Sequence, residues 1–504
     1  MLEYRVLSSF HPTADSALPM MLHVRSFVCL AAMLAAAPLT FAADPPRRPN
    51  IVFILADDLG YGDVGCYGQK RIKTPNIDRL AREGMRFTDF YAGCTVCAPS
   101  RCVLMTGYHM GHCYVRGNAG QNDRSIQILR DQDVTVAEVL KKAGYATALC
   151  GKWGLGEEGS IGVPNKQGFD YFFGYLNQHH AHNYFPAYLF RNETRQLLQN
   201  IVPGGGDFGS GVASVKVEYS PDLITAAALQ WVEQHQDQPF FLYYAPTLPH
   251  ANNEGGKQGM EVPDLGDYSS TDWPAQQKAH AAMISRLDAD IGKLQSLLKK
   301  LKLEEDTLVF FSSDNGPHRE GGNDPDFNDS NGRLRGIKRS LTDGGIRVPC
   351  IARWPGRIKA GTTNDFVGGF QDILPTLAEV TGAAANVPKD IDGLSLVPTL
   401  LGQAEKQQQH DYLYWAFYEG GGGQAARAGR WKAVQQPYHS PVRLYDLTTD
   451  IGEEHDVAAE HPEIVAKLSE QMKQAYTPSE NWKFADKAAA PKAKSKAGKS
   501  PPQP

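Results

Sequence analysis

Four short apolar runs, at residues 49–56, 145–150, 239–245 and 307–313, restrict the fold more than any other feature of this chain. Runs of this length without polar alternation are typical of strands buried on both faces of a parallel sheet. Helices are predicted at 74–84, 135–142, 220–236 and 276–301, and a further strand at 85–91. This alternation predicts an α/β fold with a large mixed, mainly parallel sheet flanked by helices.

The pattern of predicted secondary structure changes near residue 402. Short strands are predicted at 412–418, 431–434 and 443–446 around a turn at 420–423, followed by a helix at 462–476. We therefore expect a main domain over 44–401 and a smaller antiparallel sheet plus helix over 402–484. Residues 485–504 are rich in Ala, Lys and Pro, and a disordered tail is predicted there.

The beginning of the chain has the pattern of an export signal. A basic segment and a short apolar core precede Thr40-Phe41-Ala42, so we predict a signal peptide over 1–43, with translation starting at Met20 or Met21. The mature protein is then periplasmic or extracellular. No later apolar run approaches the ~20 residues of a membrane span, and a net charge of -5 argues against nucleic acid as a partner.

Polar residues follow the carboxyl ends of the predicted strands, where open α/β sheets bind ligands. They are Asp57, Asp58, Lys152, His250, Asp314 and Asn315. The three aspartates and the asparagine offer oxygen ligands suited to a hard divalent cation such as calcium or magnesium. Either pair alone is better explained as turn chemistry. The two pairs together favour a metal.

The segment Cys97-Ala-Pro-Ser-Arg101, taken alone, has two interpretations. It can form a nucleophile and anion pocket, with Pro99 stiffening the turn. Alternatively, Cys97 is a structural cysteine that pairs with Cys94, Cys102 or Cys113. Because Lys152, Lys338 and His250 add further positive or proton-donating groups, a substrate with a sulfate, phosphate or similar tetrahedral group is expected.

Six fragments in order carry a family resemblance. They are Asp57-Asp-Leu-Gly60, Cys97-Ala-Pro-Ser-Arg101 with Leu104-Met-Thr-Gly107, Gly144-Tyr-Ala-Thr147 with Gly151-Lys-Trp153, Pro249-His250, Ser313-Asp-Asn-Gly-Pro317, and Arg335-Gly-Ile-Lys338 with Asp343-Gly-Gly-Ile-Arg-Val-Pro349. From about residue 48 to about 475 the chain resembles the type I sulfatases of the alkaline-phosphatase-like superfamily.

The resemblance implies that a formylglycine-generating enzyme oxidises Cys97 to formylglycine, whose hydrate is the nucleophile. A gem-diol can attack with one oxygen and use the other to expel sulfate. The resemblance also implies one calcium ion, bound by Asp57, Asp58, Asp314, Asn315 and the modified Cys97. Further implied roles are holding the hydrate for Arg101, sulfate neutralisation for Lys152 and Lys338, and protonation of the departing alcohol for His250.

One departure from the family concerns Gly154. Many sulfatases have histidine directly after the Gly-Lys-Trp run, and it is credited with a base role. His182 is a candidate replacement, although a sugar contact is slightly favoured for it, and His318 is a second candidate substrate contact.

The predicted function is therefore a sulfuric ester hydrolase acting on a sulfated carbohydrate, a substrate suggested by the aromatic and histidine-rich segment 171–188. One alternative is a phosphodiesterase or phosphonate monoester hydrolase of the same superfamily. Another is a non-catalytic glycan-binding relative, against which the intact set of side chains argues.

If Cys29 leaves with the signal, seven cysteines remain. Conversion of Cys97 leaves six, an even number compatible with pairing.

Overall fold

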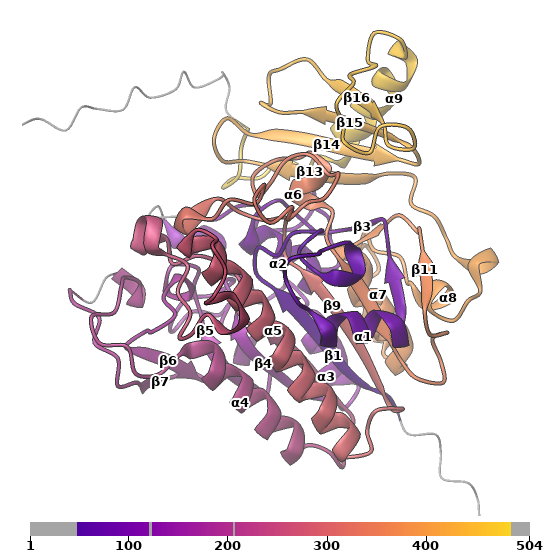
Figure 1. Cartoon of the computed structure of the whole chain (residues 1–504). Helices are drawn as coiled ribbons and strands as arrows, with labels where there is room; N and C mark the ends of the chain where they lie inside the picture. Colours follow the sequence, from indigo (N-terminus) through magenta and orange to yellow (C-terminus); the bar gives the residue numbers. More distant parts are fainter. Residues whose placement is uncertain (1–47, 120–122, 205–206, 485–504) are drawn as a thin grey trace, which may run out of the picture. The chain divides into compact units, whose positions relative to one another are not determined.

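The computed structural model describes residues 48–119, 123–204 and 207–484. The predicted signal peptide and tail lie outside these residues. A ten-stranded sheet has the order β11-β2-β10-β9-β1-β8-β4-β5-β6-β7 (Figure 1). Its strands are β1 (Asn50–Ala56), β2 (Met85–Phe87), β4 (Ala146–Lys152), β5 (Tyr171–Tyr175), β6 (Tyr188–Arg191), β7 (Thr194–Leu197), β8 (Phe240–Ala245), β9 (Thr307–Ser313), β10 (Cys350–Arg353) and β11 (Thr362–Asn364).

The predicted buried strands form the centre of this sheet. Strands β9, β1, β8, β4 and β5 are adjacent and parallel, whereas β10, β6 and β7 run antiparallel to their neighbours. Successive residues of β1 point to opposite faces, and all seven are buried. The prediction of a mixed, mainly parallel sheet is confirmed.

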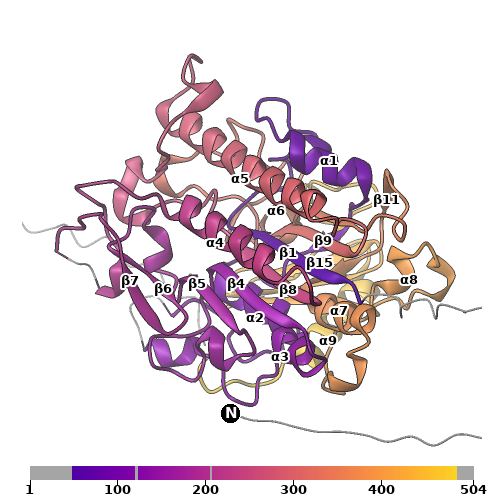
Figure 2. The ribbon, with the colours of Figure 1, turned by 90° about the horizontal axis from the view of Figure 1, so that it is seen from below.

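Helices cover both faces of the sheet (Figure 2). One apolar core joins Val52 and Ile54 to helices α1 (Pro75–Glu83), α4 (Ser220–Gln234) and α5 (Ala275–Lys300). The other joins Ile51 and Phe53 to helices α2 (Cys97–Thr106), α3 (Val136–Lys142) and α7 (Ile373–Thr381). The two short helices are α6 (Asp343–Ile346) and α8 (Val397–Leu400). The sheet is therefore buried on both sides, as its continuous apolar strands require.

The strand predicted at 85–91 is divided in two. Strand β2 joins the large sheet, whereas β3 (Phe90–Tyr91) pairs with β12 (Gly368–Gly369) in a separate two-stranded sheet. Asp89 lies between them, and its carboxylate contacts Arg347 at 2.9 Å and Arg427 at 2.8 Å. The break therefore coincides with an ion cluster that joins Asp89 to two arginines from distant parts of the chain.

The C-terminal part forms a four-stranded antiparallel sheet with a helix, as predicted. Its strands are β13 (Leu413–Phe417), β14 (Gly423–Ala428), β15 (Trp431–Gln435) and β16 (Arg443–Asp446), and the helix is α9 (Pro462–Ala475). Strand β14 was not predicted, because its sequence Gly-Gln-Ala-Ala-Arg-Ala lacks the β-branched and aromatic residues typical of strands. Trp415 Nε1 donates to Ala92 O at 2.9 Å and joins this sheet to the segment before Cys97.

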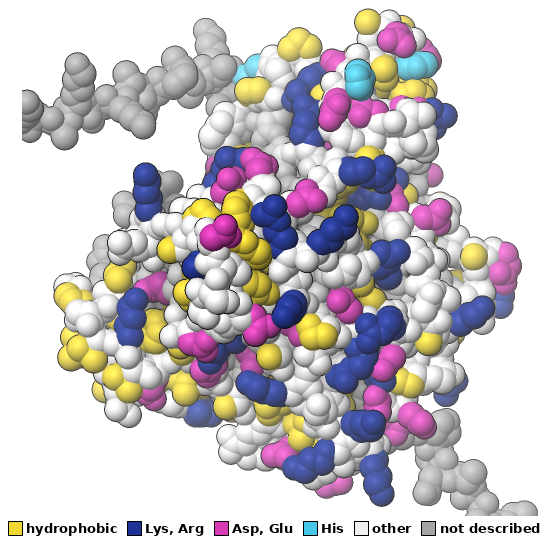
Figure 3. All heavy atoms as spheres, viewed as in Figure 1, with side chains coloured by type: hydrophobic (Ala, Val, Ile, Leu, Met, Phe, Trp, Pro, Cys, Tyr) yellow, Lys and Arg dark blue, Asp and Glu magenta, His cyan; other side chains and the backbone are white. Residues whose placement is uncertain are grey.

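Three further features concern the surface and the cysteines. No helix in the described ranges is long and apolar enough to cross a membrane. The seven cysteines of the described residues are free thiols. Large exposed apolar side chains include Leu197, Ile201 and Val217, and Figure 3 shows apolar side chains gathered at the edge where Figure 1 places β6 and β7.

Candidate active site

The predicted site residues meet at one edge of the sheet. In the parallel register Ala56 of β1 lies opposite Ser313 of β9, so the Asp57-Asp58 and Asp314-Asn315 pairs follow neighbouring strands. Lys152 is the last residue of β4. His250 follows β8, which lies between β1 and β4 in the sheet. All these side chains are buried. The expectation that they converge at the carboxyl ends of the strands is therefore met for this set.

Cys97 is the first residue of α2, where the backbone changes from the extended Val96 to helix. Its Sγ lies 3.4 Å from Asp57 Oδ1. Pro99 falls in the first helical turn, where a missing N–H costs nothing, so it starts a helix rather than stiffening a turn. Ser100 faces away from this contact, because its Oγ accepts a hydrogen bond from Gly93 N at 3.1 Å.

Arg101 lies one helical turn beyond Cys97 and on the same face. Its Nη2 and Nε donate to Asp314 Oδ2 at 2.7 and 3.1 Å. Its Nη1 donates to Lys152 O at 2.9 Å. The guanidinium thus joins the first turn of α2 to the ends of β9 and β4.

Two lysines face the adjacent aspartates. Lys152 Nζ lies 2.8 Å from Asp57 Oδ2, and Lys338 Nζ lies 2.8 Å from Asp58 Oδ2. Burial alone would raise the pKa of Asp57, but the charge of Lys152 and then that of Arg101 hold it well below its usual value. Both carboxylates are therefore ionised despite their burial.

His250 completes the group. Its Nδ1 is 2.6 Å from Ala251 O, which requires a proton on Nδ1, so Nε2 presents a lone pair. Lys338 Nζ donates to this Nε2 at 3.2 Å. Burial and then the charge of Lys338 hold the pKa of His250 well below its usual value. The proton therefore lies on Lys338, and the neutral imidazole accepts a hydrogen bond from its ammonium.

The side chains fit a hard divalent cation. Ligand atoms of Asp57, Asp58, Cys97 and His250 lie within 4.8 Å of one another. Asn315 Oδ1 is buried and has no hydrogen-bond partner among the described residues, while its Nδ2 donates to Asp58 Oδ1 at 2.7 Å. An unpartnered amide oxygen among ionised carboxylates is a ligand set that a hard cation prefers. Asp314 contacts Arg101 and, at 3.0 Å, the backbone N–H of Asp58.

Comparisons with known proteins decide the family. The family described as "Sulfatase" matches residues 49–383, more than half of the chain, and "N-sulphoglucosamine sulphohydrolase, C-terminal" matches residues 337–478. The chain belongs to the sulfatase family. The predicted family and enzyme class, a sulfuric ester hydrolase, are thereby confirmed.

Relatives of this sulfatase cover nearly its whole described length. It is 35% identical over 473 residues to human arylsulfatase A, covering 84% of this chain and 87% of the relative. It is 31% identical over 506 residues to an N-acetylgalactosamine-6-O-sulfatase of Bacteroides thetaiotaomicron, covering 86% and 94%. A solved structure of Ps i-CgsB in complex with k-i-k-neocarrahexaose has a TM-score of 0.71 and 27% identity, covering 87% of this chain and 96% of the other.

The space beside Gly154 of the sulfatase is filled by Gln178. Gly154 has φ +82°, a conformation that favours glycine, and a Cβ there would lie only 2.2 Å from Gln178 Nε2. Residues 177–183 follow β5 and pass along the ends of β4 and β8. Sequence reasoning missed Gln178, because only the fold brings it to Gly154.

His182 was the residue predicted from the sequence to replace the family histidine missing at position 154. It lies instead beside His250. The two rings stack with centroids 5.1 Å apart and planes 12° apart. His182 Nδ1 is 3.2 Å from both carboxylate oxygens of Glu254, which orients the ring. His182 thus borders the site on the His250 side.

His318 lies behind His250 and is completely buried. Its Nε2 is 3.2 Å from Pro249 O, and its Nδ1 is 3.2 Å from Glu320 Oε2. Although burial opposes the charge, Glu320 raises the pKa of His318. One ring nitrogen faces a backbone carbonyl and the other forms an ion pair with Glu320, an arrangement that suits support of His250 better than the predicted substrate contact. No motif marked Glu320 in the sequence.

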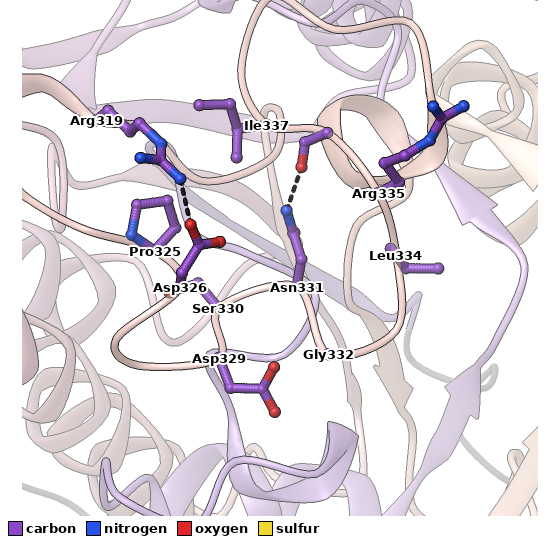
Figure 4. A pocket seen from close by; sticks show the side chains of 11 residues that line it. Arg319, Pro325, Asp326, Asp329, Ser330, Asn331, Gly332, Leu334, Arg335 and Ile337 are labelled. Atoms are coloured by element: carbon purple, nitrogen blue, oxygen red, sulfur yellow. Dashed lines mark hydrogen bonds and ion pairs between the residues drawn. The ribbon is translucent and has the colours of Figure 1, made fainter. Parts of the chain in front are cut away.

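Two other features lie apart from this group. A cavity of about 320 Å³ is lined by residues of the 319–337 loop, where Arg319 pairs with Asp326 and Asn331 Nδ2 donates to Gly336 O (Figure 4). None of the predicted site residues lines it.

His109, His112 and Asp392 form a second compact group. Gly111 N donates to His109 Nδ1 at 3.0 Å, which puts the ring proton on Nε2 toward Asp392, so this group is a hydrogen-bonded network.

Proposed function

We propose that the protein hydrolyses a sulfate ester of a carbohydrate, with formylglycine formed from Cys97 as the nucleophile. The observation that carries this proposal is the contact of Cys97 Sγ with Asp57 at the junction of α2 and the strand ends. The names of the relatives support the substrate class, since they include an N-acetylgalactosamine-6-O-sulfatase and a structure with a neocarrahexaose.

The electrostatics of Cys97 favour modification over thiol catalysis. Burial and then the Asp314 carboxylate raise the pKa of the Cys97 thiol well above its usual value. A thiol that stays protonated is a poor nucleophile. Formylglycine, in its hydrated form, supplies two hydroxyl groups on one carbon, one for attack on sulfur and one for release of sulfate.

Calcium is the cation that we assign to the oxygen ligands. The residues that would hold it are Asp57, Asp58, Asp314, Asn315 and the modified residue 97. When bound, it supplies Lewis-acid stabilisation of the sulfate oxygens. Arg101 keeps Asp314 and the first turn of α2 in register with these ligands through its two bonds to Asp314.

Of the remaining side chains, some act on the sulfate group and others on the leaving alcohol. Lys152 and Lys338 place positive charge next to the aspartates and can balance the sulfate charge. The Lys338–His250 pair holds a proton at Lys338 Nζ, 3.2 Å from His250 Nε2, and this pair protonates the departing alcohol oxygen. His182 lies beside His250 and contacts the sugar.

Maturation requires two further events. A formylglycine-generating enzyme must modify Cys97, and the predicted signal over residues 1–43 directs export to the periplasm or the extracellular space. Peptide mass spectrometry of the secreted fraction checks both events. Cytoplasmic protein with an intact amino terminus would contradict the export proposal.

The test compares ester classes. Protein produced together with a formylglycine-generating enzyme is assayed on 4-nitrophenyl sulfate, 4-nitrophenyl phosphate and defined sulfated saccharides, with Cys97→Ala as the inactive control. We expect sulfate release to dominate. Faster cleavage of phosphate or phosphonate esters would support the alternative hydrolase, and saccharide binding without turnover by the modified protein would support a glycan-binding relative.

A further inference from the structure

Gln178 carries a buried hydrogen-bond donor with which no described residue pairs. The residue is 8% exposed, and its Nε2 has no hydrogen-bond partner among the described residues. Leaving such a group unsatisfied in the interior lowers the stability of the folded protein. Buried polar groups are paired in the large majority of cases, so this one calls for an explanation.

The position of Gln178 links the donor to the site. Its amide packs against Gly154, two residues after Lys152 at the end of β4. Four residues later His182 stacks on His250. The segment between them therefore borders the site from the Lys152 side to the His250 side, with Gln178 at the Lys152 end.

The chemistry of the donor selects its partner. The buried unpartnered atom is the nitrogen, which can only donate, so it suits a group that can only accept. A sulfate ester presents such oxygens, whereas a sugar hydroxyl also donates. Lys152 and Lys338 are already paired with Asp57 and Asp58, but the Gln178 amide is not committed to a carboxylate.

We propose that Gln178 Nε2 donates a hydrogen bond to a sulfate oxygen of the bound substrate. The inference rests on the proposed function of the same site. Because an amide does not titrate in the physiological range, Gln178 binds and orients the sulfate but cannot act as a base beside Gly154. The unpaired donor also costs stability in the free protein, which a sulfate oxygen would offset on binding.

The test measures stability and sulfate binding separately. Gln178→Met keeps the volume of the side chain and removes the donors. We expect an unchanged or higher Tm, at least about a tenfold weaker Kd for inorganic sulfate by calorimetry, and a raised KM for 4-nitrophenyl sulfate. Gln178→Glu places an acceptor and a negative charge there, and we expect a larger loss of sulfate affinity.

Gln167→Ala is the matched control. Gln167 is also buried, with 1% of its surface exposed, but its Nε2 donates to Ile161 O at 3.1 Å, away from the predicted site residues. We expect this variant to lower Tm and to leave the Kd for sulfate unchanged.

Parent-like sulfate binding and KM in Gln178→Met, with the parent active, would overturn the inference and leave the proposed function intact. A lowered Tm with unchanged sulfate Kd would show a structural glutamine only. If the modified parent neither binds sulfate nor releases it from esters, the proposed function fails and the inference with it.

Discussion

Arg101 and Asp314 form a fully buried ion pair, in which Nη2 and Nε of the arginine share one carboxylate oxygen at 2.7 and 3.1 Å. The pair connects the helix that begins at Cys97 to the end of β9. Because neither side chain reaches solvent, water and salt do not screen the ion pair, and the surrounding packing fixes its geometry. It therefore keeps the position of Cys97 relative to the proposed calcium ligands constant.

Breaking this pair should cost much of the stability of the protein. We expect Arg101→Met to lower the free energy of unfolding by about 3–5 kcal/mol, because it removes one partner of a buried hydrogen-bonded pair and leaves the Asp314 carboxyl group without its guanidinium. Urea unfolding in the presence of a chelator measures this without a contribution from bound cation. Arg101→Met/Asp314→Asn should lose less than the sum of the single changes. Strict additivity would show that the two side chains are not coupled.

Calcium should stabilise the folded protein through Asp58. A ligand that binds only the folded state at 100 times its Kd adds about 2.7 kcal/mol, so Tm should rise with calcium and fall after chelation. In Asp58→Asn this dependence should be lost. Asp392→Asn is the control, because Asp392 belongs to the His109–His112 network, and it should keep the calcium-dependent shift. An equal shift in parent and Asp58→Asn would contradict the assigned ligands.

Stability between pH 4 and 6 should depend on Asp288. This side chain accepts hydrogen bonds from Asn76 N and Ile77 N at the start of α1, at 2.9 and 2.8 Å. Burial raises the pKa of Asp288 to about 6 from 3.8. Because Asp288 binds more protons in the folded than in the unfolded state in this window, its contribution to stability is greatest below pH 4 and falls as pH rises to 6.

Asp288→Asn should remove this component, which is on the order of 2–3 kcal/mol. The difference in unfolding free energy between parent and variant, measured by urea unfolding from pH 4 to 7, reports it. A constant difference across this range would show that Asp288 has an ordinary pKa in the folded protein.

His182 should matter more for saccharides than for small esters. Its ring lies against His250, and Glu254 orients it, so we expect it to contact the sugar that leaves. We expect His182→Ala to raise KM for a sulfated saccharide several-fold, with little change in KM for 4-nitrophenyl sulfate. A loss of kcat on both substrates would instead indicate the base role.

The sequence was most informative about groups whose place follows from a strand. Asp57 and Asp314 could be predicted to meet because buried apolar runs precede both and parallel strands end at one edge. Thr135 likewise marked the start of α3, where it forms a capping box with Glu138. In these cases the local pattern and the packed structure agree.

What could not be predicted depends on loops that fold back from a distance. Gln178 reaches Gly154 only because the chain after β5 returns along the sheet edge, and Glu320 meets His318 and Lys338 through a loop without a motif. The helix beginning at Cys97 was also missed, since Pro99 is compatible with a turn and with a first helical turn. Tertiary packing decided each case.

Cys97 is the residue on which the proposed chemistry depends, and one measurement tests it most directly. Preparations made with increasing amounts of formylglycine-generating enzyme are analysed for the converted fraction of residue 97 by peptide mass spectrometry and for kcat on 4-nitrophenyl sulfate. The account predicts that kcat rises in proportion to this fraction and extrapolates to zero for the unmodified thiol. Full turnover by protein that retains the Cys97 thiol would contradict it.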